Sequence, residues 1–228
     1  MKRSVEFNLD GTLAQQCYEQ LQTEIIQGIL KPGEKLKVEP IKQRFGIGQA
    51  PVREALYKLS AFGLVDVEDN KGFRVAEISE KDIRDTYEVF TNIENIALAW
   101  AIKRGDEHWE ANIVAELHKL SLIELSEKAI QTSLWAKRNY DFHVALISGC
   151  QSPTLMETRR HLYMKFDRYC QMAYQLSTHT SHNNHNEHKQ LAQAVLQRDR
   201  KQAKQLMIEH INEPLETVIQ EFKRHNFF

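Results

Sequence analysis

Apolar residues recur at three- and four-residue steps in three stretches near the start of the chain, a spacing typical of helices with one buried face. The first stretch begins at Thr12, a residue type that caps helices, and runs to about Gly28. The second covers residues 38–45, and the third lies in residues 46–63, with its helix starting at Ala50. The residues expected to be buried in the first and third helices are Leu13, Cys17, Leu21, Ile25 and Ile29, and Val52, Ala55, Leu56, Leu59 and Phe62.

After Gly63 the period changes from that of a helix to that of a strand. Apolar and polar residues alternate in L-V-D-V-E and again in F-R-V-A, on either side of the turn-forming residues Asp69-Asn70-Lys71-Gly72. This arrangement predicts a β-hairpin with Lys71 and Arg74 on it. Three helices followed by a hairpin form a winged helix-turn-helix, which we assign to residues 1–78.

From Ser79 to the end of the chain only helical periodicity is present, with no strand signal. Gly105 and Gly149 mark two of the breaks, and Pro214 predicts a kink or a new start in the last helix. The fold class is therefore mainly α: a winged helix-turn-helix of three helices plus a β-hairpin wing, then an all-α six-helix bundle in residues 79–228. The helices are expected at about 80–104, 107–128, 131–149, 152–177, 184–198 and 200–225. The tryptophans expected to pack this bundle are Trp100, Trp109 and Trp135.

Charge is distributed unevenly along the chain. The whole chain has a formal charge of −1 at pH 7, but residues 31–58 hold seven Lys and Arg against three Glu, a local charge of +4. Because salt screens phosphate attraction beyond about 10 Å, a local patch can bind DNA where the total charge cannot. A helix with a buried face and a basic free face suits the major groove, although an ordinary amphipathic surface helix has the same spacing. The basic residues expected to contact DNA are Lys42, Arg44, Arg53, Lys58 and, on the wing, Lys71.

Composition narrows the class of protein. With 42% hydrophobic and 27% charged residues, the chain of 228 residues is expected to fold into one large core or two modest ones. No apolar run approaches the roughly 18 residues of a membrane span, and the first residues lack the apolar stretch needed for export. Three dispersed cysteines, Cys17, Cys150 and Cys170, fit a reducing compartment better than a disulfide framework. We therefore expect a cytoplasmic protein.

Some of the ten histidines have the spacing of metal ligands. Asn139 and His143 are four residues apart on one predicted helix, so both side chains project from one face. His188 and His210 lie 22 residues apart on successive helices, which an antiparallel pair would bring to one level. Three imidazoles and an oxygen would suit a divalent cation, but isolated histidines are more often hydrogen-bonded residues of a core or its rim. The series His179, His182 and His185 fits either a metal-binding tract or, more readily, a solvated loop.

These features together resemble the GntR family of bacterial transcription regulators, in the FadR subfamily with its all-helical FCD effector domain. The resemblance covers nearly the whole chain. Its carriers in order are Leu30-Lys31-Pro32-Gly33, Pro51-Val52-Arg53-Glu54-Ala55-Leu56, Leu59, Gly63-Leu64-Val65, Gly72, Phe142-His143, Glu187-His188 and Met207 to His210. Within the family the chain most resembles the carbon-starvation-induced (CsiR-type) regulators, at Lys71-Gly72-Phe73-Arg74-Val75-Ala76 and Val195-Leu196-Gln197-Arg198-Asp199.

The resemblance implies a homodimer that binds palindromic double-stranded DNA through paired recognition helices. Arg53 would contact a guanine or a nearby phosphate. Gly48, Gln49 and Ala50 stand where many relatives have Ser/Thr-Arg-Thr, so a relative's operator should not be transferred to this chain. Gln49 has an amide that can read adenine instead.

The resemblance also implies a pocket in the helical domain that holds a metal and a small organic acid. The matching metal ligands are Asn139, His143, His188 and His210, and relatives often carry Asp in place of Asn139. The metal would be Zn²⁺, Ni²⁺ or Mn²⁺, among which imidazoles alone do not choose. Many relatives have an arginine at the position of Phe90, which makes effector contacts on that side differ. The residues expected to contact the effector are Arg159, Arg160 and Asn92.

The leading hypothesis is a ligand-responsive transcription regulator, a repressor of a catabolic operon, and not an enzyme. One alternative is a metal-dependent hydrolase, for which Asp141 and Glu187 are the neighbouring candidates for a general base. Neither lies in a hydrolytic motif, and the chain has no Gly-rich phosphate loop or Ser or Cys nucleophile motif. Another alternative is a metal sensor, in which the cation itself is the regulating ligand.

Overall fold

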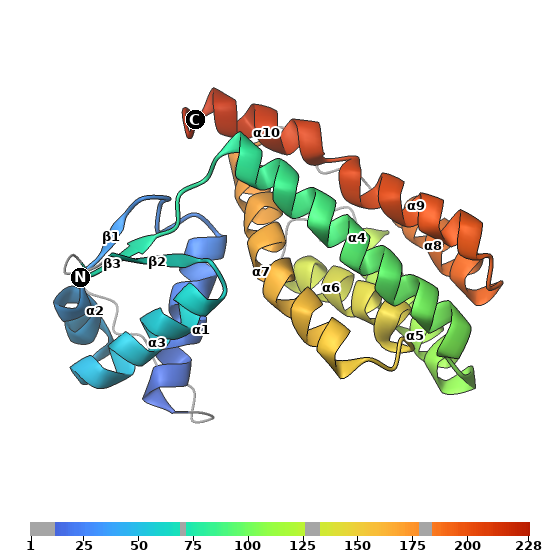
Figure 1. Cartoon of the computed structure of the whole chain (residues 1–228), viewed down its shortest axis with the longest axis horizontal. Helices are drawn as coiled ribbons and strands as arrows, with labels where there is room; N and C mark the ends of the chain where they lie inside the picture. The colour runs from blue at the N-terminus through green and yellow to red at the C-terminus, as the bar shows by residue number, and fades with distance from the viewer. Residues whose placement is uncertain (1–11, 69–71, 126–132, 178–183) are drawn as a thin grey trace. The chain divides into compact units, whose positions relative to one another are not determined.

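The computed structural model describes residues 12–68, 72–125, 133–177 and 184–228 (Figure 1). The turn residues predicted at 69–71, with Lys71 among them, and His179 and His182 lie outside these ranges. By packing, the described chain forms two compact units. One contains the chain up to Ile83 with His161–Leu176 and Val218–Phe228, and the other contains Arg84–Arg160 with Ser177–Thr217. The domain boundary at residue 78 stays a prediction.

The first part of the chain is the predicted winged helix-turn-helix. Thr12 caps its first helix, since the Thr12 hydroxyl accepts from the backbone N–H of Gln15 at 3.2 Å. The second helix ends at Gly46, which adopts the left-handed conformation with φ 63° that glycine tolerates best. The elements in order are α1 (Leu13–Ile26), β1 (Lys35–Leu36), α2 (Val38–Phe45), α3 (Gln49–Ala61), β2 (Val65–Glu68) and β3 (Gly72–Val75).

The wing is a sheet of three strands rather than a two-stranded hairpin. Its order is β1-β3-β2, with antiparallel pairing throughout, and Leu36 lies opposite Phe73. No sequence signal predicts β1, because a strand of two residues is too short for a period to be visible. This extra strand ties the segment between α1 and α2 to the wing, since the Val75 N–H also donates to the Glu34 carbonyl at 2.8 Å.

The core of this part is built by the predicted apolar faces of α1 and α3. The buried side chains include Cys17, Leu21 and Ile25 from α1 and Val52, Ala55, Leu56, Leu59 and Phe62 from α3 and its end. Two predictions were wrong: Leu13 is 48% exposed and Ile29 is 61% exposed. Leu13 is the first residue of α1 and Ile29 follows its end, so neither has a neighbouring turn to cover it.

From Glu80 onward, every helix or strand of the described residues is a helix, as predicted. The elements are α4 (Glu80–Arg104), α5 (Glu107–Glu124), α6 (Ser133–Ser148), α7 (Pro153–Leu176), α8 (His185–Leu196), α9 (Arg200–Asn212) and α10 (Leu215–Arg224). Pro214 separates the last predicted helix into α9 and α10, because proline cannot donate the backbone hydrogen bond that would continue it. Helix α5 packs against α6 and α8, and α8 packs against α9. No helix among the described residues has the length and apolar character to cross a membrane.

The Trp109 side chain of α5 packs against α6 and against the two glycines that follow α4 and α6. It is 5% exposed, and its indole N–H donates to the Ala145 carbonyl at 2.9 Å. A Cβ on Gly149 would lie 2.9 Å from the indole, and one on Gly105 would lie closer still. The two glycines predicted as helix breaks therefore also leave the space that the indole fills. Trp100 does not pack the core as predicted, because it is 37% exposed.

We expect Gly105→Ala to lower the free energy of unfolding by about 1–3 kcal/mol, because the new methyl group overlaps a buried ring that cannot move away. Chemical denaturation followed by circular dichroism measures the change. His108→Ala is the control, since His108 is exposed and lies in α5, the helix that carries Trp109. Equal stability of the two variants would contradict this account of the Trp109 packing.

Candidate functional site

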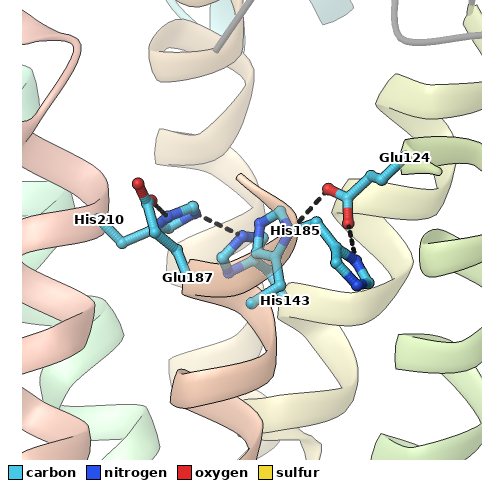
Figure 2. A network of polar contacts seen from close by, with 6 residues as sticks. Glu124, His143, His185, Glu187 and His210 are labelled. Atoms are coloured by element: carbon cyan, nitrogen blue, oxygen red, sulfur yellow. Dashed lines mark hydrogen bonds and ion pairs between the residues drawn. The ribbon is translucent and has the colours of Figure 1, made fainter. Parts of the chain in front are cut away.

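Three histidines from three helices meet inside the second unit. His143 lies on α6, His188 on α8 and His210 on α9, and one nitrogen of each lies within 4.8 Å of the others. The Nε2 atoms of His143 and His210 are 3.1 Å apart. Figure 2 shows His143 and His210 pointing toward each other from their helices. The structure thus brings together the three histidines that the sequence selected.

Two carboxylates hold two of these imidazoles in place (Figure 2). Nδ1 of His188 lies 2.8 Å from Glu124, and Nδ1 of His210 lies 2.8 Å from Glu187. A carboxylate can only accept hydrogen bonds, so each Nδ1 carries a proton and donates a hydrogen bond to its glutamate. In a neutral imidazole this leaves Nε2 as the free lone pair, which is the arrangement found in metal-binding histidines.

Glu124 is the residue of this site that sequence reasoning missed. It lies at the end of α5 and is 3% exposed, and its second oxygen also receives a hydrogen bond from His185 Nδ1 at 3.3 Å. Glutamate is seldom fully buried without a partner, and its position in the apolar series L-S-L-I-E-L was the available signal. Its partners are about 60 residues away along the chain, so only the folded chain identifies them.

On the three helices that carry the histidines, α6, α8 and α9, two buried side-chain atoms lack a hydrogen-bond partner in the described structure: Nε2 of His188 and Oδ1 of Asn139. Asn139 precedes His143 by about one turn of α6, so the two side chains share a face. A buried acceptor left without a partner costs free energy, which a cation would offset. The facing Nε2 atoms of His143 and His210 likewise need either a proton or a cation between them. This donor set fits a divalent metal.

Electrostatics keep the cluster in the form that binds metals. Burial lowers the pKa of His143 well below its ordinary value, and the nearby charges of His210, His188 and Arg159 lower it further. Burial also lowers the pKa of His188, although the hydrogen bond to Glu124 acts in the opposite direction. Both imidazoles are therefore neutral near neutral pH, with lone pairs available for coordination.

Of the three residues expected to contact an effector, one lies near the cluster. Arg159 is 1% exposed and donates from Nε to Glu94 at 2.6 Å, and its charge acts on His143. Its guanidinium also lies over the Phe90 and Tyr140 rings, at 5.7 and 5.3 Å from their centroids. Arg160 and Asn92 are exposed. Arg160 pairs with Glu157, and the Asn92 amide donates to the Glu88 carbonyl.

The start of α3 presents an exposed polar edge in the other unit. Gly48 is the N-cap of the helix, and Gly48, Gln49, Ala50 and Arg53 are all exposed. Arg53 lies over the Tyr57 and Phe73 rings and donates to the Tyr57 hydroxyl at 3.3 Å. These contacts steady a long side chain while its charge stays in solvent. A helix N-terminus with free N–H groups and a cation beside it favours anionic partners.

The other predicted basic contacts differ in how far they are already used. Arg44 pairs with the buried Glu24, at 2.8 Å for one of its two hydrogen bonds. Lys58 donates to Gln15 at 2.6 Å and lies over the Tyr18 ring. Lys42 binds Glu39 on the surface. Arg44 therefore ties α2 to α1, whereas Lys42 and Lys58 hold weak surface contacts that a phosphate can replace.

Comparison with known proteins agrees with this geometry. Residues 13–75 match the family model "Bacterial regulatory proteins, gntR family", and residues 85–213 match the FCD domain. The chain is 36% identical over 219 residues to the HTH-type transcriptional repressor GlaR of Escherichia coli (strain K12), covering 93% of this chain and 96% of that one. It is 32% identical to the HTH-type transcriptional regulator BphR of Paraburkholderia xenovorans (strain LB400), covering 92% and 86%.

A solved structure supports the fold. The E. coli protein McbR/YncC superposes with a TM-score of 0.75 at 20% identity, covering 93% of this chain and 99% of that chain. At that identity the likeness concerns the fold alone. The matches to both family models, with relatives above 30% identity along nearly the full length, carry the assignment. The chain belongs to the GntR family of bacterial regulatory proteins, with an N-terminal winged helix-turn-helix and an FCD domain.

Proposed function

We propose that this transcription regulator is a cytoplasmic repressor of a catabolic operon that binds a palindromic operator as a homodimer. It would respond to a small organic acid held at a metal-containing pocket. The observation that supports this most is the convergence of three imidazoles, one of which, His188, has a buried Nε2 with no hydrogen-bond partner in the described structure. The Asn139 Oδ1, on the same helix as His143, is likewise buried without a partner. Such a site is suited to holding a cation and, through it, a carboxylate. The printed name of one relative, a transcriptional repressor, supports the sign of regulation.

In this proposal α3 enters the major groove. Arg53 contacts a guanine or a nearby phosphate, and Gln49 reads adenine through its amide. Gly48 and Ala50 allow the backbone to approach closely, and Lys42, Lys58 and Lys71 contact phosphates. Arg44 contributes by holding α2 through Glu24. In a dimer, two such helices would lie about one turn of DNA apart, or a multiple of that.

We expect Arg53→Ala to weaken operator binding by about 1–3 kcal/mol, because a base or phosphate contact is lost. Fluorescence anisotropy with DNA from the protein's own promoter region measures the affinity. Arg53→Lys keeps the charge but loses the planar fork, so it should retain non-specific binding and lose sequence discrimination. Unchanged operator affinity in a folded Arg53→Ala variant would remove Arg53 from the interface.

The effector pocket would be formed by the ligands Asn139, His143, His188 and His210. Zn²⁺, Ni²⁺ and Mn²⁺ all suit these donors, and a bound cation would offer a coordination position to an effector carboxylate. Arg159, held by Glu94, supplies a second positive charge near the cluster. An effector alters DNA binding only if it has different affinities for two states of the dimer.

The two alternatives predict different responses. A hydrolase needs a general base beside metal-bound water, yet Glu124 and Glu187 both accept hydrogen bonds from histidines, and Asp141 pairs with Lys137 at 3.1 Å. A metal sensor would change its DNA affinity with metal alone. Titrating DNA affinity separately against metal ions and against small carboxylic acids distinguishes the cases. Turnover of a candidate acid would support the enzyme.

We expect His188→Ala to abolish stoichiometric metal binding and Glu124→Gln to weaken it by about 10–100-fold, because Glu124 orients the imidazole. Isothermal titration of the metal-stripped protein with Zn²⁺, Ni²⁺ and Mn²⁺ measures both. His118→Ala is the control, since His118 is an exposed histidine on the same helix as Glu124. Equal affinities in all three variants would exclude this site.

In the metal-stripped protein we expect stability to fall as the pH decreases from about 7 to about 5. Folding lowers the pKa of His143 and His188, whereas unfolded imidazoles titrate near about 6.5. Below that pH the unfolded chain binds more protons, so stability present at higher pH is lost as the pH falls toward the folded pKa values. Urea unfolding at several pH values in this range measures the free energy of unfolding. This free energy should change less with pH in His143→Gln/His188→Gln than in the control His118→Gln. An identical change with pH in both would contradict the burial of neutral imidazoles.

A further inference from the structure

Helix α4 carries an exposed stripe of apolar and charged side chains. Three large apolar side chains on it face solvent: Val89 is 42% exposed, Ile96 is 45% exposed and Trp100 is 37% exposed. The Arg104 guanidinium lies 4.3 Å from the centroid of the Trp100 ring and so braces that indole at the surface. Apolar side chains exposed next to one another on one surface are typical of a site that binds another protein, whereas single exposed apolar residues are common on any protein.

The residues of the stripe are separated by alternating steps of four and three, and this series of steps is the same in either direction along the helix. The positions of the stripe are Asp85, Val89, Asn92, Ile96, Ala99 and Lys103, and Trp100 flanks it next to Ala99. Alternating steps of four and three residues are those of a helix that packs along another helix. Charge breaks the symmetry of the stripe, because its first turn is acidic and its last turn is basic. Glu88 adds to the acidic end, and Arg104 adds to the basic end.

A groove beside the basic end continues this surface. It lies between α4 and α9, has a volume of about 370 Å³, and its α4 wall is mostly apolar, whereas its α9 wall is cationic. Figure 1 shows α9 running alongside α4 in this unit. Within the described residues, Arg200, Lys201 and Lys204 of α9 form no ion pair. The groove is lined by Asn95, Leu98, Ala99 and Ile102 on α4 and by Arg200, Lys201 and Lys204 on α9.

We propose that this stripe is the surface through which two copies of the chain pair, with α4 antiparallel to α4 of the partner. The inference rests on the proposed homodimer and specifies where it forms. The axis of symmetry would pass at the level of Glu94, midway between Asn92 and Ile96. Asp85 then faces the partner's Lys103, Val89 faces the partner's Ala99, and Asn92 faces the partner's Ile96.

Charge decides the direction of pairing. A parallel arrangement would set acidic turn against acidic turn and basic turn against basic turn, which is unfavourable at close range. The antiparallel arrangement sets opposite charges together at both ends. It also brings the partner's Glu88 to the groove, where Lys201 and Lys204 supply the counter-charge. Two-fold symmetry forms every one of these contacts twice.

The same pairing accounts for a polar residue at the centre of the stripe. Asn92 is exposed within one chain, and its amide donates to the Glu88 carbonyl of its own helix at 3.0 Å. One of its donors therefore has a partner already when the side chain faces the partner's Ile96. Val89, Ile96 and Trp100 would be removed from water on both copies, which supplies the favourable free energy. Asn92 thus has a role in assembly rather than in the pocket.

Reciprocal charge reversal tests the proposal in the full-length protein. Asp85→Lys/Glu88→Lys makes both ends basic, and Lys103→Glu/Lys201→Glu/Lys204→Glu makes both ends acidic. Each variant alone should show a dimer dissociation constant raised at least 10-fold in sedimentation velocity. An equimolar mixture should recover the dimer, because the two reversed chains complement each other at both ends. Glu107→Lys, an exposed reversal away from the stripe, is the control and should dimerise as the unmodified protein does.

Ile96→Glu provides a second measurement that does not depend on charge pairing. It should be monomeric alone and in mixtures, with an unchanged circular dichroism spectrum. If the unmodified protein is a dimer and all of these variants remain dimers, the α4 surface is wrong while the homodimer stands. If the unmodified protein is a monomer that still binds its operator, the proposed dimer itself is wrong. Loss of the dimer in both charge variants with recovery in the mixture supports the α4 pairing.

Discussion

The second unit depends on two hydrogen bonds from histidine Nδ1 to a glutamate: His188 to Glu124 and His210 to Glu187. Each fixes the proton on one ring nitrogen and so directs the other toward the centre of the cluster. Without these carboxylates the imidazoles could rotate or exchange tautomers, and the buried Nε2 atoms would have no common orientation. Burial adds to the effect by keeping His143 and His188 neutral. The imidazoles therefore have nitrogen lone pairs that could bind a cation.

The residues proposed to read DNA are exposed in one unit, whereas a charged pair near the histidines is buried in the other. The winged helix-turn-helix keeps Gly48, Gln49, Ala50 and Arg53, the residues proposed to read DNA, exposed at the N-terminal part of α3, where the helix dipole and nearby cations favour phosphate. The other unit buries charged groups, because Arg159 and Glu94 are each 1% exposed and pair with each other, and the Arg159 charge still acts on His143. Surface charge suits rapid, salt-dependent association with DNA. Buried and hydrogen-bonded charge suits selection of one small ligand.

Helix α4 contributes both to the surroundings of the histidine cluster and to the proposed pairing surface. Its inner face carries Glu94, which holds Arg159 near the cluster, and its outer face carries the stripe proposed for pairing. A change in the pocket and a change in dimer geometry would therefore act on the same rigid element. Coupling through one helix with two faces needs no long chain of intermediate contacts. It makes the dimer the natural element on which an effector would act.

The sequence by itself determined the elements: helical and alternating periods located the winged helix-turn-helix and the helical domain, and the spacing of His143, His188 and His210 selected the cluster. These signals are local, repeated over many residues, and set by backbone geometry. Tertiary structure alone decided the partners. It placed Glu124 against His188, put Arg159 inside and Arg160 and Asn92 outside, added β1 to the wing, and exposed Trp100. Such facts depend on contacts between distant segments, and no period along the chain records which faces meet when it folds.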